Sequence, residues 1–77
     1  MMRKERWTLG LQGRMAAHVV ETWTMRDMPC ELRLVRSRKT GGVCCLVAEV
    51  AKNESEAIEF LGDVVRATGC PVSRQDL

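Results

Sequence analysis

The spacing of hydrophobic residues changes several times along this chain, and these changes of period limit the folds that it can adopt. Alternate residues are apolar over 6–11, which places Trp7, Leu9 and Leu11 on one face of a predicted strand. From Arg14 the period becomes that of a helix. The chain therefore begins as a strand followed directly by an amphipathic helix.

This first helix is predicted over 14–28. Pro29 disfavours helical geometry at the residue before it, and so it ends the helix at Met28. The apolar stripe of the helix consists of Ala16, Val19, Val20 and Trp23.

Two further strands are predicted in the middle of the chain. Apolar residues alternate over 30–36, and a polar turn that contains Gly41 and Gly42 follows. The segment 43–50 is almost continuously apolar, which is typical of a strand inside a sheet.

A second helix is predicted after these strands, with Asn53 as its N-cap and Glu56 completing a capping box. Its apolar stripe consists of Ala57, Ile58, Leu61, Val64, Val65 and Thr68. Gly69 is suited to the left-handed position after a helix, and Pro71 prevents continuation. The last residues, 72–77, are either a short edge strand or a loose tail.

The order β-α-β-β-α, with an optional last strand, predicts the α+β class. Two helices that are apolar on one side would cover one face of an antiparallel sheet of three or four strands, giving an open-faced sandwich. The 77 residues allow one domain, 1–77.

Composition excludes several classes of function. The net charge of +2 is too small for a dedicated nucleic-acid binder. No apolar run approaches the roughly 20 residues that span a bilayer, and the basic N-terminus lacks the apolar segment of a signal peptide. We therefore expect a cytoplasmic protein without a membrane partner. The cysteines lack C-x-x-C spacing, so we expect reduced, apolar thiols and no metal or cofactor; they are Cys30, Cys44, Cys45 and Cys70.

The junction between the first strand and the first helix is the candidate site. Backbone N–H groups at a helix start have no intrahelical partner and attract anions. Gly13 lets an anion approach the backbone, and Arg14 adds a fork of donors that suits phosphate. Gln12 can donate a hydrogen bond but cannot act as a nucleophile. An ordinary turn with a solvated arginine would show the same residues.

The segment GLQGRMAA, residues 10–17, resembles the active-site segment of the histidine-containing phosphocarrier (HPr) family of the bacterial sugar phosphotransferase system. That family has the pattern Gly-(Leu/Ile)-His-x-Arg-Pro-Ala at the start of its first helix. The matching residues are Gly10, Leu11, Arg14, Ala16 and Ala17. The segments 30–40 and 42–69 are similar to the family's second strand and to its last strand and C-terminal helix.

The resemblance implies a regulatory docking protein and no enzymatic activity. The phosphorylated histidine of the family falls at Gln12, which cannot carry a phosphoryl group. The implied contacts for a phosphate or for a partner (enzyme I or a regulatory protein) are Gln12, Gly13, Arg14, Ala16 and Ala17. His18 is the only histidine and is either a replacement acceptor or an ordinary helix residue.

The chain departs from the family in its middle. Thr40 passes directly to Gly41, where the family has a third strand and a short helix, so no position here corresponds to the family's regulatory serine. Uncovered strand edges predict weak self-association.

Two alternatives belong to other classes. The element order and Lys39 before Gly41 are also similar to bacterial microcompartment shell proteins, which predicts a cyclic oligomer. Basic residues near the hairpin could bind nucleic acid, but the three aromatic residues fall on core stripes, which disfavours base stacking. They are Trp7, Trp23 and Phe60.

Overall fold

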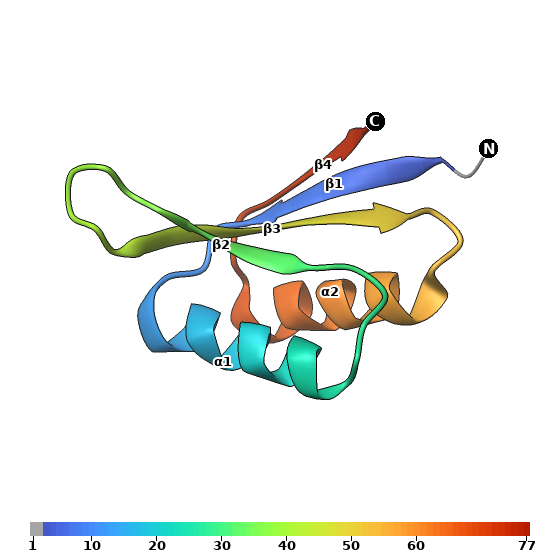
Figure 1. The fold of residues 1–77 in the computed structure, drawn as a ribbon, viewed down its shortest axis with the longest axis horizontal. Coiled ribbons are helices and arrows are strands. Elements are labelled where there is room, and N and C mark those ends of the chain that lie inside the picture. The colour runs from blue at the N-terminus through green and yellow to red at the C-terminus, as the bar shows by residue number, and fades with distance from the viewer. Residues whose placement is uncertain (1–2) are drawn as a thin grey trace.

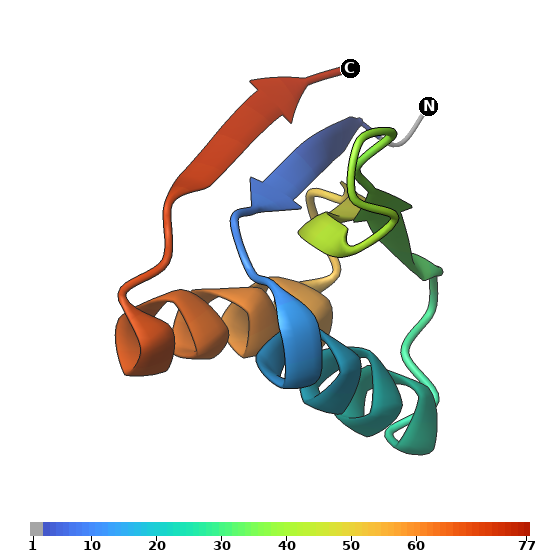
Figure 2. The same cartoon turned by 90° about the vertical axis from the view of Figure 1, so that its left-hand side faces the viewer.

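A computed structural model describes residues 3–77. The elements are β1 (Lys4–Leu9), α1 (Gly13–Met25), β2 (Leu32–Arg36), β3 (Val43–Ala51), α2 (Ser55–Thr68) and β4 (Val72–Asp76). The strands form one antiparallel sheet in the order β2-β3-β1-β4, and both helices cover the same face of it (Figure 2). The predicted open-faced α+β sandwich is confirmed, and the tail of the chain supplies a fourth strand.

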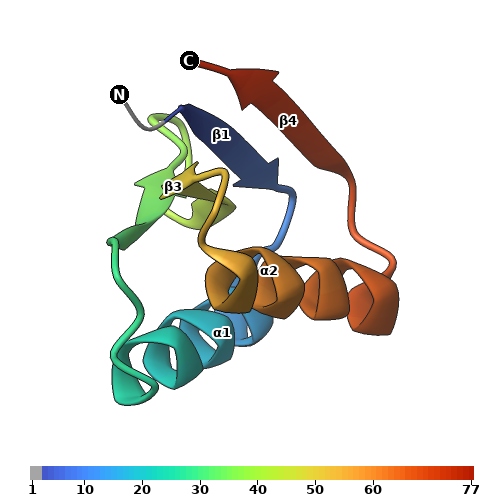
Figure 3. The ribbon, with the colours of Figure 1, turned by 90° about the vertical axis from the view of Figure 1, so that its right-hand side faces the viewer.

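The two helices connect strands that run parallel but are not neighbours. β3 lies between β1 and β2, and β1 lies between β3 and β4 (Figures 1 and 3). The structure is therefore two interlocked β-α-β units, each split by a strand of the other, as in ferredoxin-like folds. Many unrelated activities share such an arrangement, so the fold by itself does not identify a function.

The central strands set which residues face the helices. In the β1–β3 register, Leu9 lies opposite Leu46 and Trp7 lies opposite Ala48, and all four are buried beneath the helices. Residues between them, such as Thr8, lie on the open face. The predicted alternation is confirmed, although β1 ends two residues earlier than expected and Leu11 is buried in the following loop.

Helix α1 ends at Met25, three residues before the predicted end at Met28. Asp27 has a φ of 53°, which no residue within a right-handed helix adopts. The Arg26 N–H still donates to the Thr22 carbonyl at 3.0 Å, and the chain then leaves the helix. Pro29 forbids helical geometry just before itself, but it does not oblige the helix to reach that point.

Helix α2 begins at Ser55, so the predicted cap at Asn53 is wrong. Glu54 occupies the N-cap, and its side chain makes no capping hydrogen bond. The predicted end is confirmed. Gly69 has a φ of 66°, a conformation that glycine adopts without strain, and its N–H donates to the Val65 carbonyl at 2.8 Å.

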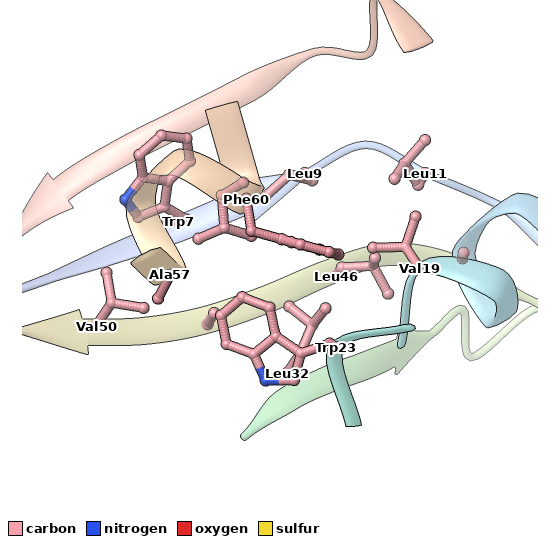
Figure 4. Close-up of a cluster of buried hydrophobic side chains, with 13 residues drawn as sticks. Trp7, Leu9, Leu11, Val19, Trp23, Leu32, Leu46, Val50, Ala57 and Phe60 are labelled. Carbon is pink, nitrogen blue, oxygen red and sulfur yellow. The ribbon is translucent and has the colours of Figure 1, made fainter. Parts of the chain in front are cut away.

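The core is a single cluster between the sheet and the helices (Figure 4). Trp23 of α1 meets Phe60 of α2 edge to face, with ring centroids 5.5 Å apart. The Trp23 Nε1–H also donates to the Cys30 carbonyl at 2.7 Å, which ties α1 to the segment before β2. Each half of the chain thus contributes an aromatic anchor, as the apolar stripes predict.

Candidate functional site

The N-terminal end of α1 is exposed at the surface. Gln12 is extended, and Gly13 begins the helix with a φ of 57°, where a side chain would be strained. The first intrahelical bond runs from the Ala16 N–H to the Gln12 carbonyl at 3.3 Å. The N–H groups before Ala16 therefore have no acceptor within the helix, and the Gln12 side chain does not cap them.

Most of the predicted site residues are exposed around the start of α1. Gln12, Gly13, Arg14 and Ala17 are all exposed. Ala16 is completely buried in the core, so its side chain has no surface to offer a ligand or partner. Ala16 instead lets α1 approach the sheet closely and thereby positions its exposed neighbours.

The turn between β2 and β3 lies beside this helix end, which the sequence did not predict. Together they line an open hollow of about 620 Å³. Its lining residues are Gln12, Gly13, Ser37, Thr40, Gly42, Val43 and Cys44. The only signal for it in the sequence is the polar, glycine-containing turn itself, because the proximity of two segments distant in sequence depends on the sheet topology.

Hydroxyl groups of this turn are used to hold its own backbone. The Ser37 Oγ accepts from the Lys39 N–H at 3.2 Å, and the Thr40 Oγ1 accepts from the Gly42 N–H at 3.2 Å. The Arg36 guanidinium donates to the Gly41 carbonyl at 3.1 Å. The turn is thus internally bonded, and it presents a defined wall to the hollow.

Three basic residues are close in sequence to the residues that line the hollow, although none of the three lines it. Arg14 at the helix start and Arg38 and Lys39 in the turn are exposed, and none of the three forms an ion pair within residues 3–77. No carboxylate lines the hollow. A negatively charged group here would therefore meet the unpaired N–H groups of the helix start, with the three cations in neighbouring residues.

An apolar groove of about 260 Å³ adjoins this end of α1 and runs between the two helices. Its lining residues are Met15, His18, Val19, Thr22, Phe60, Val64, Ala67 and Thr68. Met15 lies at the margin of the groove and is 52% exposed. Its apolar side chain makes no favourable contact with the surrounding water. His18 lies on the exposed side of α1, beyond the turn in which helix N–H groups are free.

Glu5 is the only buried charged residue in the part of the chain that the structure describes, and it was not among the predicted site residues. Its Oε1 accepts hydrogen bonds from the Trp7 Nε1–H at 2.8 Å and from Arg74 of β4 at 2.6 Å. The Arg74 guanidinium also lies over the Trp7 ring, 4.2 Å from its centroid. Burial raises the pKa of Glu5, but the hydrogen bonds from Arg74 and Trp7 outweigh it and hold the pKa below its usual value.

The four cysteines are unpaired and half-buried. Burial raises the pKa of Cys30, and burial together with a hydrogen bond involving Cys44 raises the pKa of Cys45. A raised pKa suppresses the thiolate, which is the reactive form. Within residues 3–77, no group of three His, Cys, Asp or Glu side chains is placed to hold a metal ion.

The open face of the sheet carries both polar and apolar side chains. Arg6 and Glu49 form an ion pair at 2.9 Å in its centre, with Val47 and Arg33 beside them. Every tryptophan and phenylalanine is buried on the helix side, so this face has no aromatic platform for a base among the described residues.

No helix in residues 3–77 has the length and apolar character that crossing a membrane requires. The chain matches no protein-family model, no curated protein and no solved structure. The similarity to the phosphocarrier family therefore depends on the quoted sequence segments alone.

Proposed function

We propose that this chain is a non-catalytic, phosphocarrier-like docking protein that binds a partner protein through α1 and the anion-attracting end of that helix. One observation carries the proposal: the free N–H groups and Arg14 at the helix start lie beside a carboxylate-free hollow and an apolar groove. A partner that places a carboxylate or phosphate in the hollow and an apolar side chain in the groove would use both.

The chemistry of the site supports binding rather than catalysis. Gln12 stands where the resembling family has its phosphorylated histidine, and an amide neither titrates nor attacks phosphorus. The Ser37 and Thr40 hydroxyls have neither a histidine nor a carboxylate beside them in the hollow to act as a base. A phosphoryl group could be held here by hydrogen bonds, but the lining residues offer no acceptor of the family's kind for it.

The partner class follows from the same chemistry. The family resemblance points to enzyme I of the phosphotransferase system or to a regulatory protein with an acidic docking surface. Positive charge around the hollow would speed association with such a surface and would make binding weaken with salt. Four unpaired thiols suit the reducing cytoplasm, where we place the protein.

The direct test is an amide chemical-shift titration of the isotope-labelled protein with the N-terminal domain of an enzyme I. We expect shifts that cluster over residues 12–25, at the hollow and along the exposed side of α1. An absence of shifts at high partner concentration, or shifts confined to the open face of the sheet, would reject docking through α1.

Arg14→Ala sharpens this test. Arg14 is exposed and makes no ion pair in the described residues, so we expect partner binding to weaken by about tenfold while the unfolding free energy changes by less than about 0.5 kcal/mol. Arg66→Ala is the matched control, because Arg66 is also an exposed helix arginine but pairs with Asp63 on α2. Equal weakening by both variants would mean that only net charge matters.

A shell-like oligomer is the second candidate, because the tail forms strand β4, as that similarity requires. It predicts a stable ring of identical chains. The mass of the native protein in solution, measured by light scattering, separates a ring from a docking protein that is a monomer or a weak dimer.

A further inference from the structure

The outer edge of β2 has no strand beside it in residues 3–77. Its unpaired N–H and C=O groups can therefore receive another strand. Two apolar side chains lie on this edge strand: Leu34 on the helix side is 37% exposed, and Val35 on the open side is 38% exposed. Within one chain, β2 thus leaves backbone hydrogen-bonding groups unpaired and apolar side chains partly exposed to water.

We propose that β2 pairs antiparallel with β2 of a second copy, across a two-fold axis through Leu34, to form one continuous sheet. In this register, Leu34 faces Leu34, Arg33 faces Val35, and Leu32 faces Arg36. Apolar side chains then meet at the centre, and Arg33 lies over the exposed side chain of Val35. The proposal concerns β2 alone and does not depend on docking through α1.

Other registers fit less well. A shift by one residue would oppose residues from different faces, which a continuous sheet does not allow. Placing the axis at Arg33 sets two arginines directly opposite each other, which is destabilising. Placing it at Val35 pairs only the last three residues of β2 within the strand and sets Leu34 opposite Arg36. The sequence of β2 is therefore self-complementary in one register, which favours a second copy as the occupant.

The second edge strand is a poorer candidate. Two-fold pairing centred on β4 sets Arg74 opposite Arg74. Arg74 and Asp76 are also already paired within the chain, with Glu5 and Lys52. Exposure of apolar side chains in mid-strand distinguishes β2 from β4.

The expected dimer is weak. A five-residue strand is about 17 Å long, which gives a small interface compared with permanent dimers. The two Arg33 side chains are diagonal neighbours about 7–8 Å apart, so they repel each other. Salt screens charges at this distance, with a Debye length of about 8 Å at 0.15 M, and should tighten the dimer. An anion-binding surface would show the opposite dependence.

Sedimentation equilibrium of the whole protein from about 10 µM to about 1 mM tests the proposal. We expect a monomer–dimer equilibrium that Leu34→Lys weakens by at least about tenfold, because it opposes two ammonium groups on the axis. Val72→Lys is the matched control: Val72 is an exposed apolar residue of the other edge strand, at 42%, and the charge change is the same. A wild-type monomer throughout, a ring, or equal weakening by the control would overturn the proposal.

A cross-link tests the register, and it stays decisive if Leu34→Lys unfolds the chain. Residue 34 faces its own copy with Cβ atoms about 5 Å apart, whereas residue 33 lies on the diagonal, about 7–8 Å from its copy. A disulfide needs Cβ atoms within about 4.5 Å, a separation that the facing pair approaches and the diagonal pair does not. Mild oxidation should therefore cross-link Leu34→Cys dimers well above the level that the native thiols give in the wild type, and Arg33→Cys, which lies opposite Val47 of β3 and not opposite a native thiol, should not exceed that level. The reverse result would refute this register.

Discussion

β2 and β4 are the two edge strands of the sheet, and they have the same length but are attached in different ways. β2 is anchored by Leu32, which is buried in the core, and it leaves Leu34 and Val35 half exposed. All five residues of β4 are exposed. Besides its backbone pairing with β1, β4 is held by Arg74 on Glu5 and Trp7 and by an ion pair of Asp76.

The difference shows two ways of managing a sheet edge. An edge strand attached through the core keeps apolar character, which a second strand can use. An edge strand attached through charges offers little to a neighbouring chain, because charged side chains discourage pairing. Its side chains instead contact a buried carboxylate, that of Glu5, through Arg74. Three substitutions separate these attachments: Leu32→Ala, Arg74→Ala and Glu5→Gln.

Leu32→Ala should destabilise the protein most, by about 2–5 kcal/mol, because it removes a side chain that is 5% exposed and leaves a cavity between β2 and α1. Val72→Ala on β4 should change the free energy of unfolding by less than about 0.5 kcal/mol, since Val72 packs little. Urea unfolding followed by tryptophan fluorescence measures both. Similar losses for the two variants would show that the edges are attached alike.

Arg74→Ala should cost about 1–3 kcal/mol, because it leaves the Glu5 carboxylate buried with only the Trp7 N–H as a partner and uncovers the Trp7 ring. Lys52→Ala is the control, because its ion pair with Asp76 is exposed and such pairs contribute little. The same urea experiment applies. If Arg74→Ala were as mild as Lys52→Ala, β4 would be held by its backbone alone.

The fold was predictable from the sequence wherever apolar side chains recur with the period of a strand or a helix. Alternation located β1, and the continuous apolar run located β3 as a central strand, because burial on both sides requires such a composition. β4 stayed undecided, because its pairing with β1 rests on the backbone and on Arg74, neither of which leaves an apolar pattern. The predicted end of α1 was wrong, because the positive φ of Asp27 ends the helix before the limit that Pro29 sets.

The candidate site was predictable only in part. Residues 12–14 were located correctly at a helix start, because the hydrophobic period changes there from that of a strand to that of a helix. The turn that contains Gly41 and Gly42 was predicted too, but its position beside the helix start was not, because segments distant in sequence meet only through tertiary structure. The burial of Glu5 could have been predicted. Residues 5, 7 and 9 alternate along one strand and point to the same face, so extending the predicted strand by one residue places Glu5 on the core face with Trp7 and Leu9.

The pH dependence of Glu5 gives the smallest expected effect. The fold lowers the pKa of Glu5, so below about pH 4.5 the unfolded chain binds a proton that the folded chain still refuses. The unfolded state then holds more protons, and stability falls as pH falls. Above that pH both states are ionised, and the contribution is fully present. Glu5→Gln keeps an acceptor for the Trp7 N–H but removes this titration.

The variant should therefore lose less stability than the wild type between about pH 5 and pH 3, in urea unfolding curves measured at fixed ionic strength. Glu49→Gln is the control, because the pKa of Glu49 is also lowered, by its hydrogen bond from Arg6, but this pair lies on the open face. If Glu5→Gln followed the wild type in parallel through this range, the attachment of β4 would not depend on the buried charge. The two edges would then differ in their side chains but not in how they respond to acid.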